Sequence, residues 1–302
     1  MTVPVAVTVG SATDVGCVRQ VNEDASFGGG RVFLVADGMG GHAAGDVASA
    51  LTVEVFATLE GEVITSEAVR GAVVRANEAV RAHAATHPES VGLGTTVAGL
   101  ALLEGPAPHW AVFNVGDSRV YLFRDGVLRQ LTIDHSEVQE MVDQGLLSPE
   151  EAAVHPSRHV ITRAVGEEPC PEVDVLLFPV ATGGRFVACT DGLTTELADE
   201  EVAAILAANH PPQDTARILV RRALEQGGSD NVTVVVVDER RAEHRNGFRP
   251  RPTRGTAHDR HRGAVLARVQ HGNLWHSRGS RRGCPSGRTG LVEPPRRGQR
   301  GR

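Results

Sequence analysis

Short apolar runs alternate with amphipathic segments along the first 240 residues of this 302-residue chain. Runs rich in Val, Ile and Thr with a period of two predict β-strands, and apolar positions three and four apart predict helices. Strands are expected at residues 3–10, 13–18, 31–36, 95–103, 110–115, 120–124, 127–131, 173–178, 185–190 and 232–237. Helices are expected at residues 43–59, 66–84, 134–144, 199–208 and 214–226. Strand runs interleaved with pairs of helices favour an α+β layered domain.

Local signals support several of these boundaries. Asp125-Gly126 lies between two alternating runs, which is typical of a tight β-hairpin. Ser66 is placed to cap the helix that follows it. Ser148 and Pro149 followed by two glutamates predict another helix start. Residues 155–166 have mixed character and are interpreted as a surface flap.

The character of the sequence changes after residue 240. Residues 241–302 hold 16 arginines against three acidic residues, whereas residues 1–240 hold 15 arginines against 34 acidic residues. Glycine and proline are frequent in the second segment, and such a composition does not easily bury a core. We therefore expect one folded domain at 1–240 and an Arg/Gly/Pro-rich, disordered basic tail at 241–302.

Overall composition narrows the class of protein. Hydrophobic residues make up 41% of the chain, which is enough for a sizeable core, and the net charge is -6. No run approaches the roughly 18 apolar residues of a membrane helix, and no signal peptide is recognisable. The four cysteines show no CxxC spacing, which favours a reducing compartment over a disulfide framework. We expect a cytoplasmic protein without a membrane anchor.

The stretch from Val35 to His42 is the first candidate for chemistry. Asp37 follows a predicted buried strand, and glycines at 38, 40 and 41 form a turn before the next helix. A carboxylate beside an accessible glycine backbone suits a cation. The same residues are also typical of a strand-to-helix turn with Asp as the helix cap.

Three further aspartates share this design. Each lies at a strand end beside Gly or Asn, and antiparallel pairing can bring such ends to one rim: Asp117, Asp191 and Asp230. Glu23 and Asp24 lie in a polar segment before the first strand of the motif. Gathered carboxylates repel each other unless a cation neutralises them, and oxygen ligands favour Mg²⁺ or Mn²⁺ over zinc. Four independent turn aspartates remain the alternative.

Arg19 is the candidate for holding an anion near these carboxylates. It lies four residues before Glu23, and its planar guanidinium can bind a phosphate through two hydrogen bonds. A solvated surface arginine is the alternative interpretation.

Seven short motifs together resemble the metal-dependent type 2C (PPM) Ser/Thr protein phosphatases, most closely their bacterial branch. The resemblance covers residues 5–238. The motifs are Arg19-x-x-Asn22-Glu23-Asp24, Ala36-Asp37-Gly38-Met39-Gly40-Gly41-His42, Gly94-Thr95-Thr96, Val115-Gly116-Asp117-Ser118-Arg119, Thr132-x-Asp134-His135-Ser136, Thr190-Asp191-Gly192-Leu193 and Ser229-Asp230-Asn231-Val232-Thr233.

This resemblance implies a four-layer α-β-β-α sandwich of two antiparallel sheets flanked by helix pairs. It implies hydrolysis of phosphoserine and phosphothreonine by in-line attack of a water that bridges two Mn²⁺ or Mg²⁺ ions. Asp37 would bridge both ions, the Gly38 carbonyl would bind one of the two, and Glu23 would help to hold one ion. Asp191 and Asp230 would complete the other.

The resemblance also assigns further roles. Asp24 would position a water at the metals and Arg19 would hold the phosphate. A third, weaker ion would be held by Asp117 and Asp191 with a flap residue. That flap position is His159, where a smaller polar residue is expected. Met39 stands where some eukaryotic members carry a histidine, and His42 lies at a different offset, so a metal-associated water is expected to act as the acid.

The resemblance implies phosphorylated proteins and a cognate Ser/Thr kinase as partners.

Two alternatives stay open, one for the domain and one for the tail. A catalytically weak sensing or binding module of the same fold would keep the motifs without turnover. The basic tail can attract nucleic acid or an acidic surface, or it can be a solvated extension.

Overall fold

The computed structural model describes residues 5–241 except 41–43, 88–91, 104, 106–107 and 182. The predicted basic tail therefore lies outside the described residues, apart from Arg241, and so does His42. Among the helices that are described, none is both long and apolar enough to cross a membrane.

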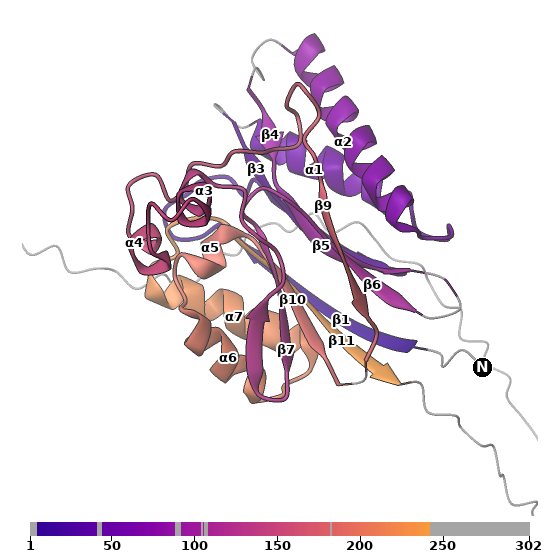
Figure 1. Ribbon diagram of the computed structural model, residues 1–302, viewed down its shortest axis with the longest axis vertical. Helices are drawn as coiled ribbons and strands as arrows, with labels where there is room; N and C mark the ends of the chain where they lie inside the picture. Colours follow the sequence, from indigo (N-terminus) through magenta and orange to yellow (C-terminus); the bar gives the residue numbers. More distant parts are fainter. Residues whose placement is uncertain are drawn as a thin grey trace, which may run out of the picture. The chain divides into compact units, whose positions relative to one another are not determined.

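Two antiparallel sheets form the centre of the domain (Figure 1). The first, called the β1 sheet, has the strand order β1 (Val5–Asp14), β11 (Val232–Arg241), β10 (Arg185–Cys189), β7 (Arg119–Arg124) and β8 (Val127–Gln130). The second, called the β2 sheet, has the order β2 (Asp24–Gly29), β3 (Val32–Met39), β5 (Val97–Leu103), β6 (His109–Val115) and β9 (Asp174–Pro179), with β4 (Gly94–Thr95) paired to β3.

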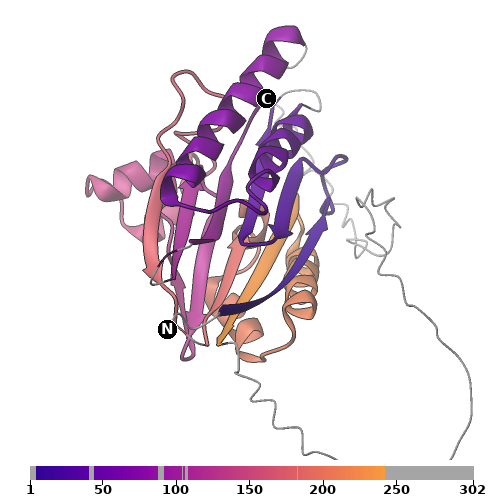
Figure 2. The ribbon, with the colours of Figure 1, turned by 90° about the vertical axis from the view of Figure 1, so that its right-hand side faces the viewer.

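Helix pairs cover the outer faces of the sheets. Figures 1 and 2 show α1 (Gly45–Ala57) and α2 (Ser66–Thr86), in purple, on the β2 sheet, and α6 (Asp199–Ala207) and α7 (Pro212–Gln226), in orange, on the β1 sheet. The short helices α3 (Glu137–Asp143), α4 (Pro149–Ala153) and α5 (Asp191–Thr194) lie at one end of the sheets. The predicted four-layer sandwich is confirmed.

Alternation along the strands divides the core into three layers. In β3, Val32 and Leu34 pack with α1 and α2, whereas Phe33 and Val35 face the other sheet. In β11, Val234 packs with the α6–α7 layer. Among the described residues, the fully buried part of the middle layer comes from strands of both sheets, with Trp110 against Phe33 and Phe186 at ring-centroid distances of 6.1 and 5.4 Å. Both faces of each sheet are thus buried.

Several local expectations are confirmed. Asp125 and Gly126 both have positive φ, 53° and 79°, as a two-residue hairpin turn requires. Ser148 forms a complete capping box with Glu151 at the start of α4. Helix α2 begins at Ser66 as predicted, but its capping residue is Thr65, whose side chain accepts a hydrogen bond from the Ala68 amide.

Other expectations are wrong. Residues 13–18 do not form a separate strand, because β1 runs unbroken to Asp14 and Gly16 then turns the chain with φ 81°. Asp24, expected at the end of a polar loop, begins strand β2, a strand for which no expectation was stated. Strand β3 does not stop before Asp37 but continues to Met39. The helix expected from 134 begins at Glu137 with Ser136 as its cap, since Ser136 forms a β-bridge with Ile161.

Candidate active site

The β2–β3 pair places the first carboxylates. Asp24 lies directly opposite Asp37 in the antiparallel register. The Asp37 amide donates to Thr96 Oγ1 at 3.0 Å, and the Gly38 amide donates to the Glu23 carbonyl oxygen at 3.1 Å. A Cβ on Gly38 would lie 2.0 Å from the Gly45 carbonyl oxygen, so only glycine fits there. The backbone is therefore fixed closely around Asp37.

A second close approach places Asp191 and Asp230. Asp191 begins α5 directly after β10, and Asp230 precedes β11. A Cβ on Gly192 would lie 1.9 Å from the Asn231 carbonyl oxygen. The two chain segments therefore touch, which brings their neighbouring aspartates to the same place.

One cavity of about 560 Å³ collects most of the predicted site. Asp117 reaches it from the segment that joins β6 of one sheet to β7 of the other. The sequence-predicted residues that line the cavity are Arg19, Glu23, Asp37, Gly38, Asp117, His159, Asp191 and Asp230. The expectation that these strand ends share one rim agrees with this geometry.

Asp24 differs from the others because it lies behind the cavity. Thr190 Oγ1 donates to Asp24 Oδ2 at 2.9 Å, whereas the buried Oδ1 atom has no hydrogen-bond partner in the described structure. Burial, followed by the nearby Asp191 and Asp230 charges, raises the pKa of Asp24 to about 7 against the opposing effect of its hydrogen bonds. Asp24 is thus a buried neighbour of Asp37.

Burial and like charge dominate the electrostatics. The pKa of Asp37 lies well above its usual range, first because the carboxyl is buried and then because Asp24 and Asp191 are close. Burial and the Asp191 charge raise the pKa of Asp117 to about 7. Each shift shows that ionising these groups together is unfavourable, and a cation among them would relieve that cost.

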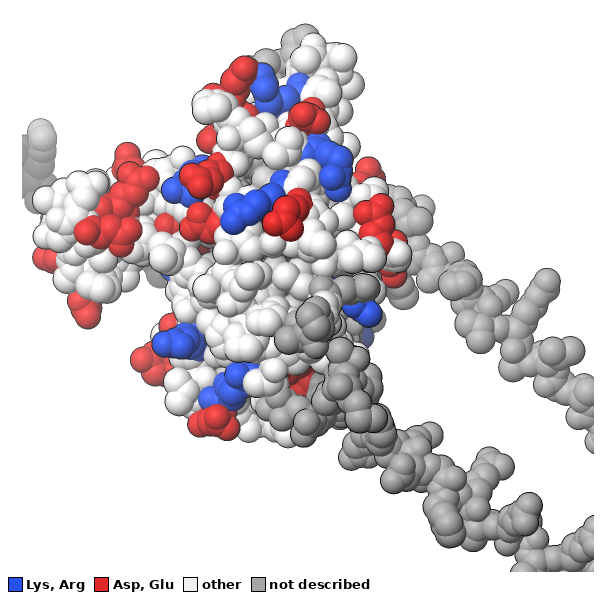
Figure 3. All heavy atoms as spheres, turned by 45° about the vertical axis from the view of Figure 1, so that its right-hand side comes forward, with Lys and Arg blue, Asp and Glu red and all other residues white. Residues whose placement is uncertain are grey.

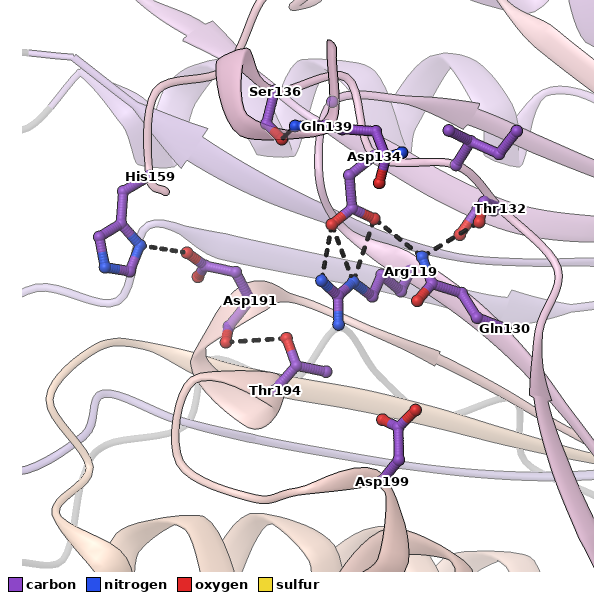
Figure 4. A network of polar contacts seen from close by, with 12 residues as sticks. Arg119, Gln130, Thr132, Asp134, Ser136, Gln139, His159, Asp191, Thr194 and Asp199 are labelled. Atoms are coloured by element: carbon purple, nitrogen blue, oxygen red, sulfur yellow. Dashed lines mark hydrogen bonds and ion pairs between the residues drawn. The ribbon is translucent and has the colours of Figure 1, made fainter. Parts of the chain in front are cut away.

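Protein cations meet two of the carboxylates. Arg19 Nη2 lies 2.7 Å from Asp230 Oδ2, and the Arg19 side chain is half exposed. His159 Nδ1 lies 3.7 Å from Asp191 Oδ2 (Figure 4). The nearby Asp191 carboxylate raises the pKa of His159. His159, which departs from the family pattern, therefore lies beside Asp191, one of the two expected aspartate ligands of the third ion.

The donor set fits a hard divalent cation in kind. It consists of carboxylates and one backbone carbonyl, which are the ligands that Mg²⁺ and Mn²⁺ prefer. Among the described residues, no three acidic, His or Cys side chains already stand close enough together to enclose one ion. Glu23 instead accepts a hydrogen bond from the Gly45 amide at 3.2 Å.

Sequence reasoning missed the polar side chains that hold the ligands. Asn231 accepts from the Glu23 amide at 2.8 Å and donates to the Val15 and Val21 carbonyls, so it fixes the loop that carries Arg19 and Glu23. Asn231 stands inside the quoted motif beside Asp230. Its position was therefore visible in the sequence, but its partners were not, because they are more than 200 residues away.

Comparisons with known proteins agree with this geometry. A family model described as protein phosphatase 2C matches residues 18–226. The serine/threonine protein phosphatase PstP of Mycobacterium tuberculosis is 42% identical over 232 residues, which cover 75% of this chain and 44% of PstP. The serine/threonine phosphatase stp of Listeria monocytogenes is 36% identical over 242 residues, which cover 75% of this chain and 93% of that protein.

Solved structures show the same fold. The crystal structure of the M. tuberculosis phosphatase PstP/Ppp superimposes with a TM-score of 0.72 at 38% identity and covers 77% of this chain and 98% of that one. A structure of the PstP catalytic domain in complex with two manganese ions gives a TM-score of 0.71 at 35% identity, covering 78% of this chain and all of that one. The chain belongs to the protein phosphatase 2C family.

Proposed function

We propose that this chain hydrolyses phosphoserine and phosphothreonine in proteins, with two Mn²⁺ or Mg²⁺ ions as its cofactor. The observation that carries this proposal is the single cavity lined by Glu23, Asp37, Asp117, Asp191 and Asp230. The phosphatase names of its relatives and the two manganese ions in the PstP structure support it. The chain spans less than half of PstP, so substrates and partners of that longer protein stay separate questions.

The proposed ligand assignment rests on the resemblance in the sequence and on the cavity that these residues share. Asp37 is central, because burial and four neighbouring carboxylates act on it at once. The Gly38 carbonyl and Glu23 would hold one ion beside Asp37, and Asp191 and Asp230 would hold the other. When bound, the two ions supply Lewis-acid activation of water and neutralise phosphoryl charge.

Arg19 is proposed to bind the phosphoryl group. Its guanidinium lies at the cavity wall and is half exposed, so a phosphate can reach the donors that Asp230 does not use. A phosphate oxygen that accepts from Arg19 would be oriented and partly neutralised as charge develops on it. Asp24, buried opposite Asp37, would position a water at the metals by accepting a hydrogen bond from it.

The third, weaker ion is also a proposal, and it involves Asp117 and Asp191. His159 lies beside Asp191, so ion and protonated imidazole would compete for the same carboxylate. We propose phosphorylated proteins and a cognate Ser/Thr kinase as partners, and the cytoplasm as the location. An interaction of residues 241–302 with nucleic acid or an acidic surface is a weaker proposal, which rests on their arginines alone.

Phosphate release from a phosphothreonine peptide tests the function directly. Turnover should require Mn²⁺ or Mg²⁺, stop with a chelator, and return when the ion is restored. Asp37→Asn and Asp230→Asn should each remove it, while Asp125→Asn, in a remote turn that tolerates Asn, should not. Undiminished turnover by Asp37→Asn would refute the assignment, and absence of turnover by the metal-loaded wild type would favour the sensing-module alternative.

A further inference from the structure

A second cavity of about 750 Å³ opens beside the carboxylate cavity. It lies between the α3–α4 segment on one side and the start of β7, residue 130 and α5 on the other, and we call it the side chamber (Figure 4). The two cavities are adjacent, because they share the lining residues Asp117, Arg158, His159, Asp191 and Thr195.

The α3–α4 wall of the side chamber is mostly apolar, with Ser136 and Gln139 as its polar side chains. Val138 and Val142 are four residues apart on α3, so both side chains lie on the same helix face. Pro149, Ala153 and Val154 continue this wall from α4 and its end. Val154 is 78% exposed, so most of its apolar surface has no cover within the described structure.

The opposite wall is polar, and two of its charges, on Arg119 and Asp134, are paired with each other. Arg119 Nε lies 3.0 Å from both carboxylate oxygens of Asp134, and Arg119 Nη2 lies 2.7 Å from Oδ2 (Figure 4). Gln130 Nε2 donates to Asp134 Oδ1 at 2.9 Å. A charged side chain placed against the Arg119–Asp134 pair would lose water without gaining a free partner, whereas an apolar one would gain contacts with Val138 and Val142.

The outer face of α3–α4 is negatively charged. Residues 130–157 contain six acidic residues and no Lys or Arg. Glu140, Asp143, Glu150 and Glu151 are exposed, and none of them forms an ion pair with another described residue. Figure 3 shows acidic side chains on the lobe at its left, where α3 and α4 lie. This surface attracts positive charge at the rim of the side chamber.

We propose that the side chamber binds the substrate polypeptide next to the phosphorylated residue. An apolar side chain close to that residue enters between the α3–α4 wall and the Arg119–Asp134 pair. An Arg or Lys farther along the peptide meets the acidic outer face. The proposal rests on the proposed phosphatase function, since it is the shared wall that ties the chamber to the phosphoryl site.

The geometry favours a substrate peptide as occupant. The chamber adjoins the carboxylate cavity, so a peptide whose phosphate lies in that cavity can extend along the shared wall. The chain's own arginine-rich residues 241–302 are the competing occupant, since they share the basic charge. The experiment separates these two occupants, because a resident segment would inhibit.

A panel of phosphothreonine peptides on the full-length chain with Mn²⁺ tests the proposal. Each peptide carries Leu, Ala or Asp at one of three positions on either side of phosphothreonine. At one position we expect kcat/KM to be about tenfold higher for Leu than for Ala, as an apolar pocket discriminates. Equal rates for Leu, Ala and Asp at every position would overturn the proposal.

Ala153→Trp fills the chamber without touching a proposed metal ligand. We expect it to remove the preference for Leu while p-nitrophenyl phosphate hydrolysis, which needs no chamber, stays within about twofold of wild type. Ala85→Trp, at an exposed position of α2, is the matched control. A retained Leu preference in Ala153→Trp, or faster turnover of every peptide as a displaced chain segment would give, contradicts the proposal.

Charge reversal tests the outer face. Glu140→Lys with Glu150→Lys should lower kcat/KM about fivefold for a peptide with a distal Arg, and this loss should shrink as salt screens the attraction. The same peptide with Gln in place of Arg should be unaffected. An equal loss for both peptides would refute the charge assignment. If no phosphopeptide is hydrolysed at all while the fold is intact, the proposed function fails and the chamber proposal fails with it.

Discussion

Gly192 lies against Asn231 so closely that a side chain at position 192 has no room. A Cβ there would lie 1.9 Å from the Asn231 carbonyl oxygen, an atom of the backbone. The contact joins the start of α5 to the start of β11, and Asp191 and Asp230 are the adjacent residues. The spacing between two proposed ligands is therefore set by a glycine.

Gly192→Ala should separate these two ligands. We expect a loss of at least about 1 kcal/mol in the free energy of unfolding, because the backbone must move. We also expect that a higher Mn²⁺ concentration is needed for half-maximal turnover. Gly71→Ala is the matched control, since it lies within α2 and its Cβ would meet only the flexible end of Arg75. That change should stabilise by about 0.5–1 kcal/mol. Urea titration measures both, and equal effects of the two substitutions would contradict the close contact.

Breaking the Arg119–Asp134 pair should cost more than breaking a surface pair. Both side chains are less than one-third exposed, and Asp134→Ala would leave the Arg119 charge without its main partner. We expect a loss of about 3 kcal/mol. Glu225→Ala, which removes the more exposed partner of Arg222, should cost about 0.5 kcal/mol. Thermal and urea unfolding of the two variants make the comparison, and similar losses would mean that the buried pair has no special role.

Acid should destabilise the fold through His135. Its Nδ1 atom accepts from the Gly116 amide at 3.1 Å, which requires an unprotonated nitrogen. Burial and Arg163 lower the pKa of His135, and this outweighs the opposing effect of Asp174 and Asp134. A lowered pKa means that the folded state favours the neutral form. This contribution to stability is complete above a pH of about 6.5 and is lost as the pH falls through the lowered pKa.

His135→Asn keeps an oxygen that can accept from the Gly116 amide but cannot titrate in this range. Its melting temperature should therefore fall less between about pH 7 and pH 5 than that of the wild type, even if it starts lower. Melting curves across this range supply the test. Parallel slopes for the two proteins would show that His135 is not the group responsible.

Metal binding should stabilise the folded chain as well as activate it. An ion that binds only the folded state adds about 2.7 kcal/mol at one hundred times its dissociation constant. We expect the melting temperature to rise with Mn²⁺, to return with a chelator, and to stay constant in Asp37→Asn. Asp125→Asn should respond like wild type. A full Mn²⁺ response in Asp37→Asn would place the ion elsewhere.

The features predicted correctly from the sequence are those marked by neighbouring residues, such as an aspartate beside a turn-forming glycine. Asp37, Asp117, Asp191 and Asp230 each stand beside Gly or Asn at a strand end, and the structure collects all four in one cavity. Helix α2 follows a plain apolar periodicity and begins at its predicted residue. These features depend on short-range patterns, so they can be identified from a single chain.

Features that depend on distant partners were not visible. The segment 24–29 has two glycines and little apolar alternation, and it becomes strand β2 only because β3 pairs with it. Asp37 interrupts the apolar run, and this predicts that the strand ends there. In the structure, Asp37 pairs with Asp24 and β3 continues to Met39. The side chamber depends on how α3 and α4 pack over β7, which no local pattern encodes.

The proposed ligands come from both sheets, and this has a mechanical consequence. Asp37 belongs to the β2 sheet, Asp191 and Asp230 flank strands of the β1 sheet, and Asp117 lies on the segment that crosses between them. The layer of Phe33, Trp110 and Phe186 packs between the same two sheets. A cation bound to ligands from both sheets would therefore link the two sheets to each other and oppose their separation.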